Sequence, residues 1–133
     1  MKLIRAYLRK EVIADVTYAL IKAGAQWLNV VHVMGLGEEM SRMHRALASE
    51  NGEYLEYTEM AKLEFLCNEP CVDVALDIIR KLAAHGWEND GIIAISPLDE
   101  VISVKTGERG KKLLCHLNQL SEEEIGKLKE KLV

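Results

Sequence analysis

Apolar and polar residues alternate in residues 2–9 and 60–66, and this period of two predicts a half-buried strand in each stretch. The apolar side chains that would share the inner face are Ile4, Ala6, Leu8, Ala61, Leu63 and Phe65. Residues 27–34 are rich in β-branched side chains and stop at Gly35, which predicts a further strand.

Apolar residues at three- and four-residue steps predict two helices, the first over residues 11–23 and the second from Pro70 to Gly86. Their buried stripes would consist of Val12, Val16, Ala19, Leu20 and Ala23, and of Val72, Ala75, Leu76, Ile79 and Ala83. Gly24 and Gly86 suit the left-handed position that follows the last turn of a helix.

The end of the chain differs in character from the rest. Ser121 and Glu124 form a capping box ahead of a narrow apolar stripe, which predicts a short helix that is marginal unless it docks on another element. The pattern therefore predicts a domain over residues 1–110 and a C-terminal extension with a short helix over residues 111–133.

The order of elements is strand, helix, strand, strand, helix, strand, with residues 92–95 as the last strand and 101–104 as one more short strand. This order predicts an α+β fold, the ferredoxin-like βαββαβ sandwich, with an antiparallel sheet and both helices on one of its faces. The other face must be buried elsewhere, so we expect self-association into a ring or dimer. The side chains that would line that face are Tyr7, Leu66 and either Val31 or His32.

A long polar connection, residues 36–59, separates the second and third predicted strands. Most connections in compact domains are a few residues long, and a connection of this size is usually functional or disordered. We therefore expect this segment to contact a partner, while the remainder of the chain holds and switches it.

Composition narrows the classes of function. Of the 133 residues, 49% are hydrophobic, enough for a core, and only 5% are aromatic, which argues against a surface that stacks on sugars or bases. The formal charge of −4 argues against nucleic-acid binding. No apolar run reaches the ~18 residues that a membrane span needs, and charge near Met1 argues against a signal peptide.

The cysteines also favour a cytoplasmic location. Cys67, Cys71 and Cys115 are odd in number and lack both the redox CxxC spacing and a four-ligand zinc pattern, so we interpret them as buried or half-buried thiols. The sequence contains no Ser-His-Asp pattern, paired-carboxylate motif or HExxH motif, and the four histidines fall on separate predicted elements. We therefore expect a protein that is not an enzyme.

With this pattern in place, the sequence resembles the PII signal-transduction proteins over nearly all of residues 1–110. The segments that carry the resemblance, besides the opening strand, are Ala19-Leu20 with Gly24, Val30 and Val33-Met34-Gly35-Leu36-Gly37, Gly52-Glu53-Tyr54, Lys62-Leu63-Glu64, Asn89-Asp90-Gly91, and Lys105-Thr106-Gly107-Glu108. The resemblance implies a homotrimer of ferredoxin-like subunits that binds adenine nucleotides (ATP, ADP or AMP) in the clefts between subunits. It also implies that the loop 36–59 docks on a target, often a membrane transporter or an enzyme, without the protein itself entering the membrane.

The resemblance implies a nucleotide site at two glycine-containing stretches. Glycines let the backbone approach a phosphate closely, successive backbone N–H groups can form an anion-binding nest, and a lysine can neutralise phosphate charge. The expected nucleotide-binding residues are Gly35, Gly37, Glu39, Asn89, Asp90, Gly91 and Lys105. The expected contact residues of the loop are Arg42, Met43, His44, Arg45, Tyr54 and Tyr57, and the two tyrosines are the candidates for modification.

Several cations of the family pattern are replaced here. Ile92 stands where the family's phosphate-binding stretch carries a lysine, and Ser103 and Lys105 stand where the family carries arginines. Glu39 replaces a glutamine that helps to hold magnesium and 2-oxoglutarate, and the lysine that pairs with 2-oxoglutarate aligns near Met60. A dianion needs cationic partners, so these departures argue against 2-oxoglutarate sensing.

The loop also suggests a different function. Met40, Met43 and His44 bring two thioethers and an imidazole within five positions, and such ligands suit soft metals such as Cu(I). The alternative hypothesis is therefore a metal-responsive binding protein of the same fold. The same methionines equally suit packing against a partner or a neighbouring subunit.

Overall fold

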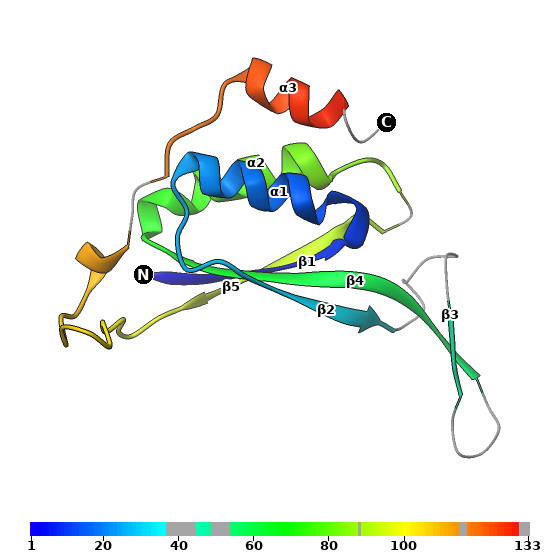
Figure 1. The fold of residues 1–133 in the computed structure, drawn as a ribbon, viewed down its shortest axis with the longest axis horizontal. Coiled ribbons are helices and arrows are strands. Elements are labelled where there is room, and N and C mark those ends of the chain that lie inside the picture. The colour runs from blue at the N-terminus through cyan, green and yellow to red at the C-terminus, as the bar shows by residue number, and fades with distance from the viewer. Residues whose placement is uncertain (37–44, 49–53, 88, 115–116, 131–133) are drawn as a thin grey trace.

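In a computed structural model of the chain, α1 and α2 cover one face of an antiparallel sheet with strand order β2-β4-β1-β5 (Figure 1). The structure describes residues 1–36, 45–48, 54–87, 89–114 and 117–130. Within these ranges the strands are β1 (Lys2–Arg9), β2 (Asn29–Gly35), β3 (Arg45–Ala48), β4 (Tyr54–Cys67) and β5 (Gly91–Pro97). The helices are α1 (Lys10–Ala23), α2 (Val72–Ala83) and α3 (Glu122–Glu130), with 3-10 turns η1 (Glu69–Cys71) and η2 (Lys111–Leu113).

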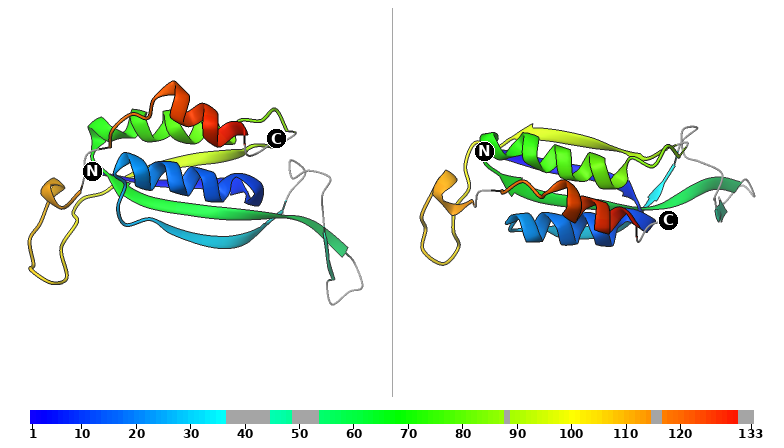
Figure 2. Two further views of the ribbon diagram at one scale, coloured as in Figure 1. Left: turned by 45° about the horizontal axis from the view of Figure 1, so that its top comes forward. Right: turned by 90° about the horizontal axis from the view of Figure 1, so that it is seen from above.

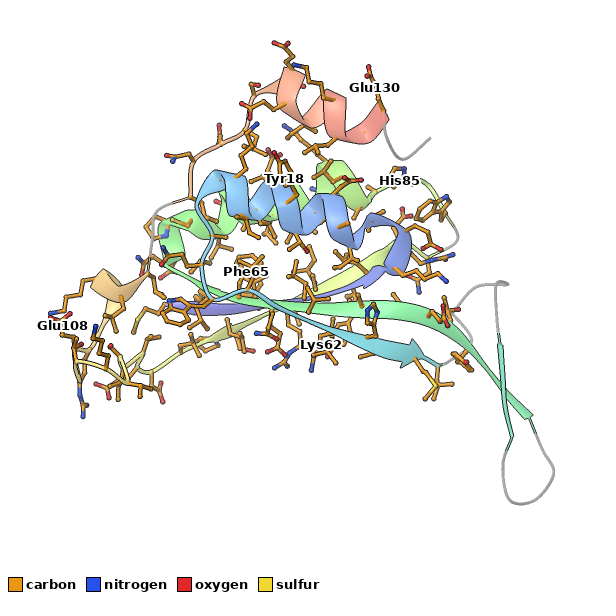
Figure 3. All side chains as sticks on the ribbon, viewed as in Figure 1. Tyr18, Lys62, Phe65, His85, Glu108 and Glu130 are labelled. Atoms are coloured by element: carbon orange, nitrogen blue, oxygen red, sulfur yellow. The ribbon has the colours of Figure 1, made fainter. Side chains whose placement is uncertain are left out.

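With the short β3 set aside, the order of elements is βαββαβ, which confirms the predicted ferredoxin-like α+β fold. The pairing of β1 with β4 and β5 places the alternating residues as predicted. The inward residues Ile4, Ala6, Leu8, Ala61, Leu63 and Phe65 are all buried. Figure 3 shows Phe65 on the helix side of the sheet and Lys62 on the opposite side.

Helix α1 matches its prediction closely. Its buried residues are Val12, Val16, Ala19, Leu20 and Ala23, and it ends at Gly24, whose φ of 112° is left-handed. The next strand begins later than predicted, because Trp27 has a φ of 62° that interrupts extended backbone ahead of Asn29. A positive φ is uncommon for a bulky side chain. The reversal of the chain between α1 and β2 therefore uses left-handed backbone at Trp27 as well as at Gly24.

Helix α2 is shorter than predicted at both ends. The residues around Pro70 form the 3-10 turn η1, and the helix ends at Ala83 because Ala84 is extended. The His85 ring lies 2.8 Å from the Leu82 carbonyl oxygen, so it meets a carbonyl group that the helix end exposes. Gly86, predicted to end the helix, follows it in left-handed backbone. The observed buried stripe is Ala75, Ile78, Ile79, Leu82 and Ala83.

The long connection contains more regular structure than the sequence analysis allowed. Strand β4 begins at Tyr54, six positions before the predicted start at residue 60, and pairs with β3 from Ala48↔Tyr54 to Arg45↔Tyr57. Tyrosine and threonine residues in the stretch 54–58 favour extended backbone, and pairing with β3 extends β4 to its early start. The predicted long loop therefore remains between β2 and β3, and the second half of the connection is a hairpin.

The predicted strand at residues 101–104 is wrong. This stretch forms one isolated bridge, between Ile102 and Arg109, and the chain turns back through Gly107 in left-handed backbone. The Arg109 guanidinium lies 2.7 Å from the Glu100 carboxylate and joins the two sides of the turn. Val104 at its tip is fully exposed. Apart from that bridge, the apolar run pairs with no strand in the part of the chain that the structure describes.

Residues 117–130 return to the helix layer, and α3 lies over α1 and α2 on the side away from the sheet (Figures 1 and 2). The predicted capping box is present, because the Glu124 N–H donates to the Ser121 hydroxyl at 3.1 Å. Ile125 and Leu128 are buried in the same apolar cluster as α1 and α2. A hydrogen bond from the Lys22 ammonium at 3.0 Å lowers the pKa of the Glu124 carboxyl.

Two of the three cysteines lie where the thiol interpretation placed them. Cys67 and Cys71 are buried and free, and burial raises the pKa of the Cys67 thiol to about 11. The Leu117 N–H donates to the Cys71 sulfur at 3.4 Å, so the start of the returning segment is attached beside η1. Cys115 lies outside the described residues.

Strand β5 begins at a residue that must be glycine. Gly91 has a φ of 117°, and a Cβ atom built there would lie 2.1 Å from the Tyr7 carbonyl oxygen. The close approach lets β5 pair with β1 from its first residue, opposite Leu8. No helix in the described ranges combines the length and the apolar composition that crossing a membrane requires.

We predict that Leu128→Ala destabilises the protein by about 2–3 kcal/mol, because it removes a buried side chain from the contact between α3 and the other helices. Leu128 is only 7% exposed. Urea unfolding followed by circular dichroism measures the change. Lys129→Ala, an exposed neighbour on the same helix, is the control and should stay near wild type. Equal effects of the two substitutions would contradict the docked position of α3.

We predict that Gly91→Ala costs more than about 2 kcal/mol, because left-handed backbone strain adds to a clash with backbone. Gly86→Ala is the matched control. Gly86 also has a positive φ, of 75°, but its added Cβ would meet no atom within 4 Å. It should therefore cost only the conformational strain, about 1 kcal/mol. Thermal unfolding of both variants measures the difference, and equal losses would contradict the close approach at Tyr7.

Candidate functional site

Two of the predicted ligand-binding stretches lie at one end of the sheet. Gly35 ends β2 opposite Thr58, and Gly91 begins β5 opposite Leu8, next to the end of β1. Since β2 and β5 are the two outer strands of the order β2-β4-β1-β5, the stretches occupy opposite edges of that end. Three strand spacings separate them, on the order of 14 Å. One chain therefore brings these stretches to the same end without bringing them into contact through the sheet.

The loop between α2 and β5 is held by its own side chains. The Asp90 carboxylate accepts hydrogen bonds from the backbone N–H groups of Gly86, at 3.1 Å, and of Trp87, at 3.2 Å. The Asn89 side-chain oxygen accepts one from the Gly91 N–H at 2.9 Å. The Asn89 hydrogen bond is an Asx-turn, and the two Asp90 hydrogen bonds reach back to the start of the loop, so side chains hold its backbone at both ends. Three N–H groups that could meet a phosphate are therefore already bonded to the side chains of Asn89 and Asp90.

An aromatic stack supports the same loop from outside. The rings of His85 and Trp87 lie 4.7 Å apart with 20° between their planes, and the Arg9 guanidinium carbon lies 5.3 Å from the centre of the Trp87 ring. This distance is within the range of a cation–π interaction. Arg9 is the last residue of β1, so the stack connects the loop to the junction between β1 and α1.

A hollow of about 320 Å³ lies beside this loop, between α2 and β5. Its lining is mostly apolar, with Ile79, Ala83 and Ile92 among the contributors, and Arg80 and Asp90 provide the charged side chains. Such a mixture suits a small organic group with an anionic end. The hollow contains two of the predicted residues, Asp90 and Gly91.

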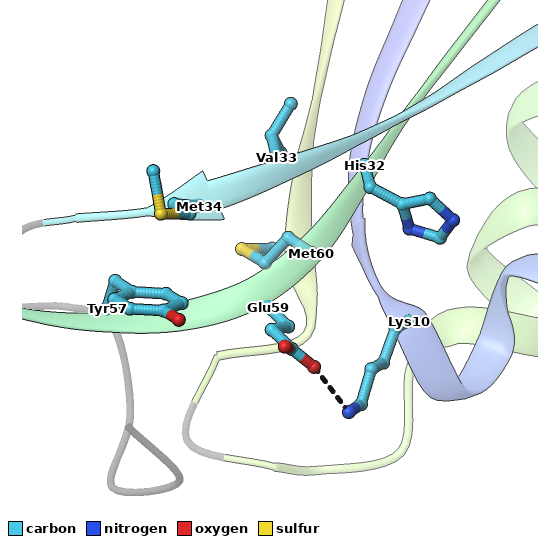
Figure 4. A pocket seen from close by; sticks show the side chains of 7 residues that line it. All are labelled: Lys10, His32, Val33, Met34, Tyr57, Glu59 and Met60. Atoms are coloured by element: carbon cyan, nitrogen blue, oxygen red, sulfur yellow. Dashed lines mark hydrogen bonds and ion pairs between the residues drawn. The ribbon is translucent and has the colours of Figure 1, made fainter. Parts of the chain in front are cut away.

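A second hollow, of about 400 Å³, lies where β2 and β4 extend beyond the helices. Figure 4 shows its lining residues, which are Lys10, His32, Val33, Met34, Tyr57, Glu59 and Met60. The Lys10 ammonium and the Glu59 carboxylate form an ion pair of 2.6 Å across it. This ion pair connects the first residue of α1 to Glu59 in β4. Glu59 directly follows Thr58, which is the partner of Gly35 at the end of β2.

Lys105 lies at the opposite end of the sheet. Strand β5 runs from Gly91, opposite Leu8, to Pro97, opposite Lys2, and the chain continues past that end into the turn of residues 101–110. Lys105 is exposed on this turn and is not on a strand. Figure 1 shows the turn beyond the N-terminal end of β1, away from β3. Among the described residues, Gly35, the stretch of residues 89–91 and Lys105 therefore do not converge within one chain.

The face of the sheet that the helices leave uncovered combines apolar and charged side chains. Strand register places Tyr7, Leu66, Val31 and Ile92 on this face, while His32 falls on the helix side, opposite Ala61. Ile92 is 66% exposed. At the centre of this uncovered face, a hydrogen bond of 2.7 Å from the Arg5 guanidinium lowers the pKa of the Glu64 carboxyl. Of the alternatives left open in the sequence analysis, Val31 is the residue that shares the face with Tyr7 and Leu66.

Three of the six predicted contact residues of the loop, Arg42, Met43 and His44, lie outside the described residues. The predicted nucleotide-binding residues Gly37 and Glu39 and the predicted metal ligand Met40 lie outside them as well. Arg45 is placed in β3, and Tyr54 and Tyr57 are placed in β4. Within the part of the chain that the structure describes, no group of three or more His, Cys, Asp or Glu side chains could hold a metal ion. The metal hypothesis depends on Met40, Met43 and His44, so it stays a prediction.

The sequence analysis missed the residues that connect the two hollows to the β1–α1 junction, which are Arg9, Lys10, Glu59, His85 and Trp87. Arg9 and Lys10 lie at the junction of the predicted strand and the predicted helix. Charged residues at such a junction are usually exposed to solvent, so the sequence provided no reason to select these two. Trp87 is a large aromatic residue within a polar turn, and this unusual position could have identified it as a contact residue from the sequence.

Comparison with known proteins places this geometry in a family. Residues 1–108 match the sequence profile described as Nitrogen regulatory protein P-II. A Nitrogen regulatory protein P-II from Synechocystis sp. is 33% identical over 109 residues, covering 82% of this chain and 96% of the relative. Nitrogen regulatory protein P-II 2 from Methanothermobacter thermautotrophicus is 34% identical over 113 residues, covering 84% and 96%. The chain therefore belongs to the nitrogen regulatory P-II family, whose members are regulatory signal transducers and not enzymes.

Proposed function

We propose that this protein is a cytoplasmic, trimeric regulator that binds an adenine nucleotide in clefts between its subunits and controls a target protein, a transporter or an enzyme, through residues 36–59. The observation that carries the proposal is the separation of Lys105 from Gly35 and Gly91 within one chain. A site made of all three stretches needs a second copy to supply the turn that carries Lys105.

The uncovered sheet face supports assembly. It combines exposed apolar side chains such as Val31 and Ile92 with the ion pair of Arg5 and Glu64. The fully exposed Val104, on the turn that extends past the sheet, suits contact with a neighbour. Contiguous apolar surface on a small domain usually marks an interaction site, and closed rings of identical subunits cover such faces repeatedly.

In this proposal the nucleotide contacts come from Gly35, Gly37, Glu39, Asn89, Asp90 and Gly91 of one subunit and Lys105 of another. The target would contact Arg42, Met43, His44, Arg45, Tyr54 and Tyr57. The glycines permit close approach of a phosphate to backbone, and Lys105 supplies positive charge. We also propose that residues 1–110 form the regulatory unit and that residues 111–133 are an extension which packs on its helices.

Regulation would follow from differential binding. A nucleotide that binds one conformation of the root of residues 36–59 more tightly than another shifts the population toward that conformation. A target that binds only that conformation would then bind this protein to an extent that depends on nucleotide occupancy. A ligand without differential affinity would shift nothing, so the nucleotide must contact the root or act on it through neighbouring residues.

Titration calorimetry with ATP, ADP and AMP tests the nucleotide part. We expect at least one of them to bind with a dissociation constant below about 1 mM, equivalent to roughly 4 kcal/mol. Lys105→Gln should weaken binding by about tenfold, because it removes one charge-assisted phosphate contact. Lys112→Gln, an exposed lysine outside the predicted site, is the control. Absence of binding by all three nucleotides at millimolar concentration would contradict this part of the proposal.

Analytical ultracentrifugation tests the assembly. We expect a particle of three 15.0 kDa chains. Ile92→Glu should shift it toward single chains, because a carboxylate on the uncovered sheet face would be buried without a partner. Ile21→Glu is the matched control, since Ile21 is similarly exposed (57%) but lies in α1, in the helix layer. A wild-type protein that sediments as a single chain would overturn the trimer.

A further inference from the structure

A series of contacts leads from the loop between α2 and β5 back to the junction of β1 and α1. The His85 ring, beside the Leu82 carbonyl, stacks on Trp87 at 4.7 Å, and Trp87 lies 5.3 Å from the Arg9 guanidinium. Arg9 is 6% exposed, so its charge is largely removed from water. A cation–π interaction is stronger when the cation is desolvated. Movement of Trp87 would therefore be felt at Arg9.

The series continues from Arg9 to the pairing of β2 with β4. Lys10 follows Arg9 directly and begins α1, and its ammonium lies 2.6 Å from the Glu59 carboxylate. Glu59 stands opposite Met34, and the next pair, Gly35 with Thr58, is the last one between β2 and β4. A stacking contact, one peptide bond and one ion pair thus connect Trp87 to the root of the long connection.

We infer that Trp87, Arg9, Lys10 and Glu59 form a coupling route, through which occupancy of the loop at residues 86–91 changes the pairing of β2 with β4 at Gly35. The inference rests on the proposed function for the identity of the ligand, but the contacts themselves do not. The four residues are positioning residues. They act on the loop backbone and on β4, and no direct contact with a ligand is assigned to them.

The two links differ in strength in a way that suits a switch. In the Arg9–Trp87 contact the cation is buried, since Arg9 is 6% exposed although Trp87 is 37% exposed, whereas the Lys10 and Glu59 side chains are 46% and 38% exposed. An ion pair so exposed contributes little to stability, and it can break and re-form at small cost. A change of loop conformation that moves Arg9 would also move Lys10, and this movement would either strengthen or break the ion pair between Lys10 and Glu59. Small differences of this kind are sufficient to shift a two-state equilibrium.

A simpler interpretation is that Trp87 only packs the loop. The two interpretations differ in what happens at β4, because packing alone predicts local effects of a Trp87 substitution, whereas coupling predicts effects at residues 58–60, which pair with β2. Spatial continuity by itself does not establish energetic coupling. The test must therefore measure the β2–β4 pairing and ligand binding separately.

Hydrogen exchange of the backbone amides of residues 58–60, measured with and without ATP, reports on that pairing. In the wild-type protein we expect ATP to change these exchange rates. In Trp87→Ala and in Glu59→Gln, ATP should still bind, by calorimetry, within about threefold of wild type, while its effect on exchange falls by about fivefold or more. Trp87→Phe keeps an aromatic ring beside Arg9 and should retain most of the effect.

Two matched controls lie off the route. Trp27→Ala removes the other tryptophan, which is exposed ahead of β2, and Lys22→Gln removes a lysine whose ion pair is with Glu124 in α3. Both should preserve the wild-type effect of ATP. An unchanged effect in Trp87→Ala and Glu59→Gln, with ATP bound, would overturn the route.

If the wild-type protein binds no ATP, the nucleotide part of the proposed function fails and the route is tested without ligand. The measurement is a double-mutant cycle of Trp87→Ala and Glu59→Gln on the same exchange rates. The route predicts that the two changes combine non-additively, by about twofold or more in rate. Additive effects in the ligand-free protein would overturn it.

Discussion

The unequal covering of the two sheet faces is the constraint on which the rest of this structure depends. Strands β1 and β4 place one set of alternating residues under α1 and α2, and the other set faces away from every helix. Both helices lie on the same side, and α3 adds a further layer there rather than on the open side. No helix in the described ranges therefore covers the apolar residues of the open face. The proposed assembly and the proposed division of the nucleotide site between chains both depend on this asymmetry.

The sequence was sufficient for the parts of the fold where periodicity and burial agree. The alternation around Ile4 and Phe65 and the stripe around Leu20 each have one buried face, so a shift of one residue would expose the core. The prediction of secondary structure failed in stretches where no buried face determines the backbone conformation. The run at residues 101–104 has strand composition, yet no described residue pairs with it beyond one bridge. The early start of β4 depends on β3, and its short sequence carries no distinctive pattern.

The candidate site was only partly accessible from sequence, for a related reason. Gly91 was predicted to bind a nucleotide, and that role stays a prediction, whereas the structure gives Gly91 a separate structural role in its close approach to Tyr7. The residues that hold the neighbouring loop could not be identified, because contacts between Arg9 and Trp87 join positions 78 apart in the chain and follow no local spacing. Charged residues at element boundaries are usually solvated, and only three-dimensional proximity distinguishes Arg9 and Lys10 from the others.

The hydrogen bonds of Asp90 have a consequence for any anion that enters the loop. Its carboxylate already occupies the N–H groups of Gly86 and Trp87, so an incoming phosphate that used those donors would replace one negative group by another. The net free energy of such an exchange is a small difference between two similar terms, since each donor is bonded before and after. Affinity at this loop would then depend on how readily one aspartate rotates into solvent, which makes weak and rapidly reversible occupancy the natural regime of the site.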